Sequence, residues 1–200
     1  GSNTQAQTSV SSPSSLGPLR VATLVKNLNH PWGIAFLPDG RLLITERPGR
    51  LRIYADGKLS TPVTGIPDVH ANGQGGLLDV EIDPDFSKNR FVYLSYSEAG
   101  SDGLAGTVVM RGKLNGNALQ NSQILFRQMP KLSSGAHFGS RLVFDKSGHL
   151  FVTLGENNNR ITAQFLDHHQ GKVVRIKPDG SIPKDNPFIG NTNAKPEIWS

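Results

Sequence analysis

The residue in this chain best suited to chemistry is His137, which stands among small residues in the stretch SSGAHFGSR (133–141). A neutral imidazole can accept a proton near neutral pH, so this histidine could serve as a base. In an isolated turn the same residue would more often be a hydrogen-bonded turn residue. Which role applies depends on the elements that position His137.

Other combinations of reactive residues are weaker. Ser140 has no Gly-x-Ser-x-Gly turn around it, so serine hydrolysis is not favoured. Asp167, His168 and His169 are adjacent, and adjacent side chains diverge on a strand or a helix, which argues against a metal site. The chain contains no cysteine, which excludes a disulfide, a thiolate metal site and a cysteine nucleophile. We therefore predict no metal ligands within these 200 residues.

Composition places the chain among globular, loop-rich proteins. Its 200 residues are 36% apolar and include 22 glycines, which disfavours a protein built of long helices. The formal charge of +5 comes from basic residues that are scattered rather than clustered, so nucleic-acid binding is not expected. No apolar run approaches the roughly 18 residues that a membrane-spanning helix needs, and we predict no membrane span.

A repeated pattern of short strands organises the chain from residue 19 onward. The segment 33–45 aligns with 141–153, and a third copy covers 79–95. Each copy is an apolar strand, a turn rich in Pro, Asp or Gly, and a second apolar strand, which is typical of a β-hairpin. Further strands are predicted at 50–55, 107–114, 123–127 and 172–177, and a short turn or helix at 162–169.

Three or four antiparallel strands that recur roughly every 45 to 60 residues predict an all-β fold, the β-propeller. A β-sandwich explains the repeat less well. The chain supplies about three blades, fewer than the roughly 4 to 8 that close a propeller. The innermost strand of each blade lines a central channel, so the segments just before these strands should face a ligand site. They are 28–32, 72–76 and 136–140.

At these three places the sequence resembles the soluble sugar dehydrogenases that depend on pyrroloquinoline quinone (PQQ), in particular the aldose sugar dehydrogenase branch. The residues that carry the resemblance are HPWGIAFLPDGRLLITERPGRL (30–51), GQGGLLDVEIDPDF (73–86), SGAHFGSRLVFDKSGHLFVTLGENNNR (134–160) and QGKVVRIKPDGSIPKDNPF (170–188). The family's propeller has six blades. The resemblance therefore implies that residues 19–200 are the N-terminal part of a single β-propeller domain.

The resemblance also implies roles for three residues. His137 matches the family's catalytic histidine, which takes the proton from the anomeric hydroxyl while hydride passes to PQQ. Gln74 matches a glutamine whose amide can donate to and accept from the cofactor and the substrate. Glu156 falls where the family carries an acidic residue that orients the histidine. We therefore expect His137 and Glu156 to be catalytic, and Gln74 and His137 to contact the cofactor.

The activity implied by the resemblance is oxidation of aldose sugars at the C1 hydroxyl to lactones, with electrons passed to an external acceptor. PQQ and calcium are the implied cofactors. The calcium ligands and the remaining PQQ contacts are expected beyond residue 200, so this portion alone is expected to be inactive. A non-catalytic propeller that binds a partner and a lactonase-like hydrolytic propeller are the alternatives.

The first 18 residues, GSNTQAQTSVSSPSSLGP, differ in composition from the rest. We interpret them as a cloning scar followed by a flexible tether, of the kind that remains on an exported protein. A periplasmic or secreted location is the corresponding expectation.

Overall fold

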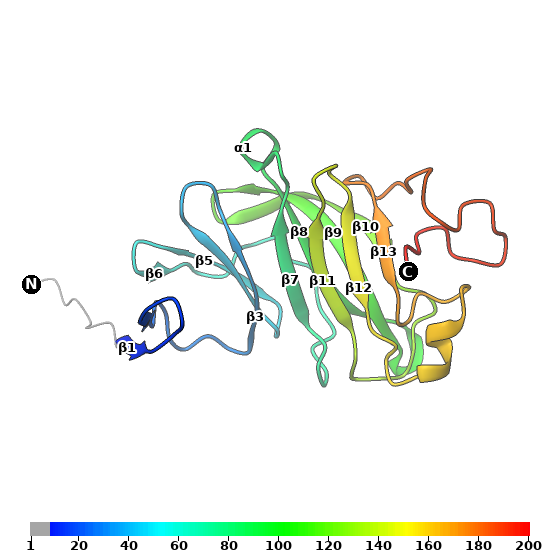
Figure 1. Cartoon of the computed structure of the whole chain (residues 1–200), viewed down its shortest axis with the longest axis horizontal. Coiled ribbons are helices and arrows are strands. Elements are labelled where there is room, and N and C mark those ends of the chain that lie inside the picture. The colour runs from blue at the N-terminus through cyan, green and yellow to red at the C-terminus, as the bar shows by residue number, and fades with distance from the viewer. Residues whose placement is uncertain (1–8) are drawn as a thin grey trace, which may run out of the picture.

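The computed structural model describes residues 9–200, and almost all of its regular structure is β-strand (Figure 1). The strands are β1 (Ser9–Ser12), β2 (Leu19–Ala22), β3 (Pro31–Phe36), β4 (Leu42–Glu46), β5 (Arg50–Ala55), β6 (Lys58–Leu59), β7 (Leu77–Ile82), β8 (Phe91–Ala99), β9 (Ala105–Asn115), β10 (Ala118–Arg127), β11 (Gly139–Phe144), β12 (Leu150–Leu154) and β13 (Val173–Ile176). The helical elements are α1 (Phe86–Asn89) and two 3-10 turns, Ser101–Gly103 and Arg160–Gln164.

These strands form three consecutive antiparallel sheets, which we call the first, second and third blades. The first blade has the order β3-β4-β5-β6, the second β7-β8-β9-β10, and the third β11-β12-β13. In each blade the strands follow one another in chain order, because short turns join neighbouring antiparallel strands. The predicted all-β fold with about three propeller blades is confirmed.

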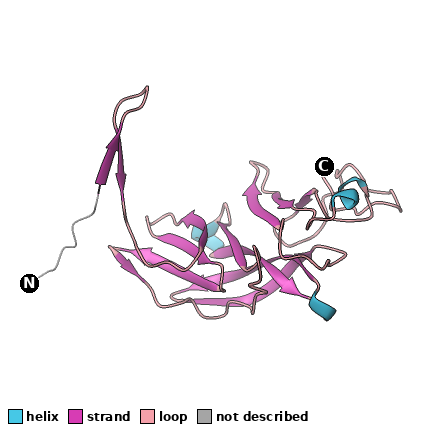
Figure 2. Cartoon of the chain, turned by 90° about the horizontal axis from the view of Figure 1, so that it is seen from below, coloured by secondary structure: helices cyan, strands magenta, loops and turns pink. Residues whose placement is uncertain are grey.

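A fourth, two-stranded sheet precedes the blades. Its strands β1 and β2 pair antiparallel and are exposed apart from half-buried Ala22, and the hairpin stands apart from the blades in Figure 2. This hairpin includes part of the predicted tether, while residues 1–8 lie outside the described residues. The boundary at residue 18 stays a prediction.

The apolar core lies between neighbouring blades. One cluster of buried side chains joins the first blade to the second and includes Leu43, Leu51 and Leu94. Another joins the second blade to the third and includes Tyr93 and Val152. Because each blade buries one face against the next, the blades are packed as a stack, and the ends of their inner strands are held at a fixed spacing.

The inner strand of every blade carries a bulge at the same place. From Pro31 to Ile34, β3 advances by three residues while its partner β4 advances by only two. The inner strands β7 and β11 show the same irregularity at Leu77–Val80 and Gly139–Leu142. The bulged residues are Gly33, Asp79 and Arg141, whose N–H groups lack a ladder partner. A serine or threonine of the second strand supplies the acceptor in each case.

These hydroxyls also join one blade to the next. Thr45 accepts from Gly33 N (2.8 Å) and donates to the carbonyl of Leu78 in the second blade (2.5 Å). Ser95 accepts from Asp79 N (2.9 Å) and donates to the carbonyl of Ser140 in the third blade (2.6 Å). Each hydroxyl therefore fixes the bulge of its own blade and the register of the following one.

In the third blade the corresponding hydroxyl is that of Thr153, which accepts from Arg141 N (3.0 Å). The pattern within a blade is thus the same in all three copies.

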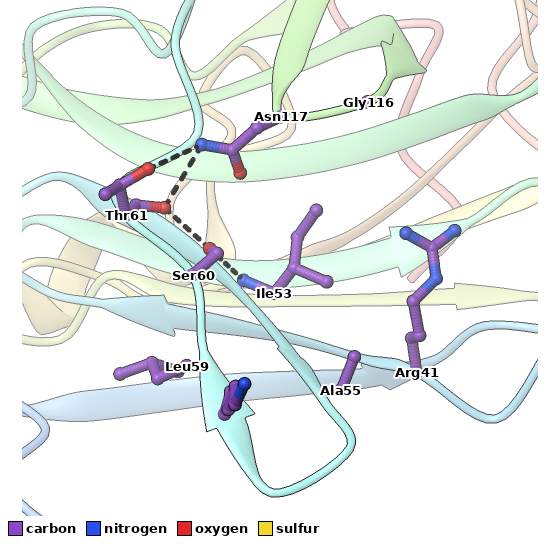
Figure 3. A pocket seen from close by; sticks show the side chains of 9 residues that line it. Arg41, Ile53, Ala55, Leu59, Ser60, Thr61, Gly116 and Asn117 are labelled. Atoms are coloured by element: carbon purple, nitrogen blue, oxygen red, sulfur yellow. Dashed lines mark hydrogen bonds between the residues drawn. The ribbon is translucent and has the colours of Figure 1, made fainter.

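The outer edges of the first and second blades are also joined by polar contacts. The Nδ2 atom of Asn117, in the β9–β10 turn, donates to Thr61 Oγ1 (3.0 Å) and to the carbonyl of Pro62 (3.2 Å). Figure 3 shows the contact between Asn117 and Thr61, which lies beside a surface depression of about 530 Å³. The depression is lined by Arg41, Ile53, Ala55, Lys58, Leu59, Ser60, Thr61, Gly116 and Asn117, and it does not contain the predicted site residues.

Candidate active site

His137 and Glu156 lie side by side at the start of β11 and the end of β12. The pairing of Gly139 with Leu154 sets the two flanking loops next to each other, at the end of the blade opposite its β11–β12 turn (Figure 1). His137 Nδ1 and Glu156 Oε1 are 2.5 Å apart. The imidazole is 44% exposed and the carboxylate 22%, so the pair opens to solvent while one side is supported by the fold.

The charge state of this pair fixes the tautomer of the histidine. The hydrogen bond from His137, helped by backbone N–H groups, holds the pKa of Glu156 below its usual range. An ionised carboxylate can only accept a hydrogen bond, so the proton of the neutral imidazole resides on Nδ1. The lone pair on Nε2 is then free to accept a proton, and Nε2 makes no hydrogen bond with any residue among 9–200.

Gln74 reaches the same place from the second blade. Its Oε1 accepts a hydrogen bond from His137 N (2.9 Å), and its own N–H donates to the carbonyl of Gly135 (2.7 Å). Gly73 allows this approach, because a Cβ at that position would lie 2.2 Å from the Gly135 oxygen. Since Oε1 is engaged with the backbone, the two hydrogens on Nε2 face away from that contact and can serve a ligand.

The structure therefore brings together the three predicted residues Gln74, His137 and Glu156. The first-blade segment 28–32 contributes Trp32, whose ring lies 4.1 Å below the guanidinium carbon of Arg141. Arg141 also donates to buried Asp79 (3.1 Å). The three segments predicted to face a common site thus all lie at the same end of the inner strands. The roles assigned to the three side chains stay predictions.

Sequence reasoning missed the residues that support this pair. Gln128 is fully buried, accepts from Thr107 N (3.0 Å) and donates to the carbonyl of Gly155 (3.1 Å). Asn157 is also buried and donates to the loop that carries His137. No local pattern marks either residue, because their partners lie on other strands or loops.

The remaining reactive residues of the sequence do not join the site. Ser140 is buried, and its hydroxyl contacts the carbonyl of Phe138 (3.1 Å) and Thr107 Oγ1 (2.9 Å). His168 pairs with exposed Asp167 (2.7 Å), whereas His169 is buried and its Nδ1 accepts from Met129 N (2.9 Å). The two adjacent histidines therefore point into different surroundings.

Two absences are noted for residues 9–200. The described residues contain no group of three or more His, Cys, Asp or Glu side chains placed to hold a metal ion. Over the same residues there is no helix whose length and apolar character would let it cross a membrane.

The three consecutive blades, with a histidine–carboxylate pair and an amide at the ends of their inner strands, define part of a β-propeller, and comparison with known proteins identifies the family. The sequence profile of the glucose/sorbosone dehydrogenase family matches residues 28–200. The chain belongs to this family.

Individual relatives agree with this assignment. The chain is 55% identical to the aldose sugar dehydrogenase YliI of Escherichia coli (strain K12), over 91% of this chain and 50% of that protein. The crystal structure of the soluble E. coli aldose sugar dehydrogenase in the apo form superposes with a TM-score of 0.84 and 56% identity, over 86% of this chain and 51% of that one. The chain spans about half the length of these two curated relatives, the E. coli protein and a protein of Synechocystis to which it is 40% identical.

A more distant relative has been solved with PQQ bound. The PQQ-bound form of aldose sugar dehydrogenase from Streptomyces coelicolor superposes with a TM-score of 0.73 and 28% identity, over 96% of this chain and 55% of that one.

Proposed function

We propose that the complete protein oxidises aldose sugars at the C1 hydroxyl to lactones, with PQQ as the primary electron acceptor and an external acceptor that takes the electrons onward. The observation that carries this proposal is the His137–Glu156 pair, which presents a free imidazole nitrogen beside the Gln74 amide. Similarity to proteins named aldose sugar dehydrogenase supports the substrate class. Similarity to a PQQ-bound structure supports the cofactor.

The residues at the site suit a flat quinone and a sugar. PQQ presents carbonyl and carboxylate oxygens, and the Nε2 hydrogens of Gln74 are donors that such oxygens accept. His137 is largely exposed and lies between small residues, Gly135, Ala136 and Gly139, so its ring can be approached from solvent. When bound, PQQ would supply a two-electron acceptor for the hydride of the sugar.

His137 would remove the proton from the C1 hydroxyl through Nε2. The neutral ring is ready to accept this proton because Glu156 holds the other hydrogen on Nδ1. The negative charge of Glu156 then stabilises the imidazolium that forms. Gln74 orients the backbone of the same loop through its contact with His137 N, so the base and the amide move as one unit.

We propose that calcium accompanies PQQ, because the cofactor's carboxylates need positive charge that Gln74, His137 and Glu156 do not provide. We propose a periplasmic or secreted location from the Ser-, Thr- and Gln-rich first 18 residues.

The test uses the complete protein supplied with PQQ and calcium, with reduction of a dye measured for several aldoses. His137→Ala should lower kcat by at least about 100-fold, because a positioned general base contributes about 10²- to 10⁴-fold. His168→Ala is the matched control, since His168 contacts exposed Asp167 and the ring of Phe165, away from the His137–Glu156 pair, and it should retain activity. Wild-type activity in His137→Ala would overturn the assignment of the base. A wild-type protein that takes up no PQQ would favour a binding module instead.

A further inference from the structure

Asn157 follows Glu156 directly and has features that a solvent-facing turn residue does not need. It is only 3% exposed, and its φ of 51° lies in the left-handed region that non-glycine residues rarely adopt. Asparagine tolerates this conformation better than most residues. The backbone therefore turns at this point so that the Asn157 side chain is directed into the protein.

Within residues 9–200, Asn157 donates three hydrogen bonds, and all of them end on the loop that carries His137. Its Nδ2 donates to the carbonyls of Ala136 (3.2 Å) and His137 (3.4 Å), and its backbone N–H also donates to the carbonyl of His137 (3.3 Å). Its Oδ1 is buried without a hydrogen-bond partner among the described residues, so the side chain is held through its donor end.

The two loops are pressed together at this point. A Cβ at Gly155 would lie only 1.8 Å from the carbonyl oxygen of His137, so the backbones touch. Where the loops meet, the carbonyls of Ala136 and His137 need a hydrogen-bond donor. The Asn157 amide is that donor. If the His137 loop were displaced, Glu156 could keep its contact with the imidazole only by changing its side-chain rotamer.

We propose that Asn157 is a positioning residue, whose amide holds the backbone of His137 where its imidazole meets Glu156. The inference rests on the proposed function, in which this imidazole is the base. Asn157 is buried, so its proposed effect on the reaction is indirect and passes through His137 and Glu156.

Asn158 provides a matched control. It has the same residue type and a similar left-handed φ of 61°, but it is exposed and its side chain makes no hydrogen bond with residues 9–200. Glycine accepts this backbone conformation at either position without strain. The changes Asn157→Gly and Asn158→Gly therefore have the same effect on the unfolded chain, and only the first removes the donor.

The experiment compares these two variants in the complete protein. With PQQ and an aldose present, Asn157→Gly should lower kcat about tenfold with little change in KM, because a small displacement of the base affects the chemical step more than sugar binding. Asn158→Gly should stay within about twofold of wild type. A thermal unfolding scan tests whether both variants are folded. If Asn157→Gly does not fold, Asn157→Asp replaces it, because aspartate keeps the side-chain volume while it removes the amide donor.

A second measurement needs no cofactor. The carboxyl carbon of Glu156 is followed by NMR as the pH is lowered, because its pKa is held down chiefly by His137. In Asn157→Gly the midpoint should move upward toward that of an ordinary glutamate, and in Asn158→Gly it should not.

Two results would overturn the inference: wild-type kcat and midpoint in Asn157→Gly, or equal losses in both variants. An inactive wild type would contradict the proposed function, and the midpoint would still decide whether Asn157 holds the pair.

Discussion

At the scale of single residues, the site is shaped by backbone conformations that are costly for ordinary residues. His137 has a φ of 54° and Ser140 a φ of 80°, both in the left-handed region. Such conformations persist where the surrounding contacts enforce them, and they often occur at functional sites. Here the enforcing contacts come from Gln74, Asn157 and Thr107, which together hold the loop from three directions.

The contribution of the negative charge of Glu156 to catalysis can be tested with a side chain of the same shape. In the complete protein, Glu156→Gln should lower kcat at least about 100-fold, because an amide neither fixes the proton on Nδ1 nor stabilises the imidazolium. Steady-state kinetics with PQQ and a saturating aldose provide the measurement. Asp167→Asn, which alters the exposed His168–Asp167 pair in the same way, should leave kcat unchanged. Equal kcat for Glu156→Gln and wild type would show that the carboxylate is not needed.

The sequence alone predicted that His137, Gln74 and Glu156 share one site, but it did not predict the buried residues that contact their loops. His137 and Gln74 could be selected because each stands directly before a repeated strand, and family resemblance added Glu156. Asn157 and Gln128 act on carbonyl groups of other segments, and a carbonyl has no signature in the sequence. Their importance depends on which loops touch, which only the folded chain shows.

At the scale of elements, the bulged inner strands and the hydroxyls of the second strands form one connected system. The alignment of the copies already placed Thr45, Ser95 and Thr153 at equivalent positions. It could not indicate that the hydroxyls of Thr45 and Ser95 donate to the next blade, because each copy contains the donor hydroxyl while the acceptor carbonyl belongs to the following copy. This partner comes from the stacking of the blades.

Removal of one of these hydroxyls should therefore lower the free energy of unfolding more where the hydroxyl lies between two blades than where it is exposed. Ser95→Ala leaves the buried N–H of Asp79 and the carbonyl of Ser140 unsatisfied, and it should reduce the free energy of unfolding by about 1–3 kcal/mol. Thr153→Ala removes an exposed acceptor of Arg141 N and should cost less than about 0.5 kcal/mol. Urea unfolding of the two variants checks the difference. Equal losses would show that the contact between blades contributes nothing.

At the scale of the whole molecule, the repeat in the sequence predicted the number and order of the blades correctly. It did not predict the β1–β2 hairpin, because that segment lies outside the repeat and its polar composition is also typical of an irregular chain. Nor did it predict α1, whose four residues occupy the turn between β7 and β8. The hairpin is exposed and lacks core packing, whereas α1 buries Phe86 in the core, and a single apolar residue within a turn gives no helical period to recognise.

The proposed cofactor should distinguish this chain from the complete protein. PQQ carries up to three carboxylates, and each charge-assisted hydrogen bond to such a group contributes about 1.5–3 kcal/mol. Gln74, His137 and Glu156 supply no permanent positive charge. We therefore expect the 200-residue chain to bind PQQ at least about 10-fold more weakly than the complete protein. Calorimetric titration of both with PQQ and calcium measures this, and equal Kd values would contradict it.

The hydroxyls that fix each bulge have a consequence for how this scaffold can be modified. Because Ser95 holds β11 at the carbonyl of Ser140, the strand is anchored from the second blade. A loop grafted at 133–136 would still have to present the two carbonyls that accept from Gln74 N and Asn157 Nδ2. Loop exchange on this scaffold should therefore keep His137 in place only where the new loop provides both acceptors.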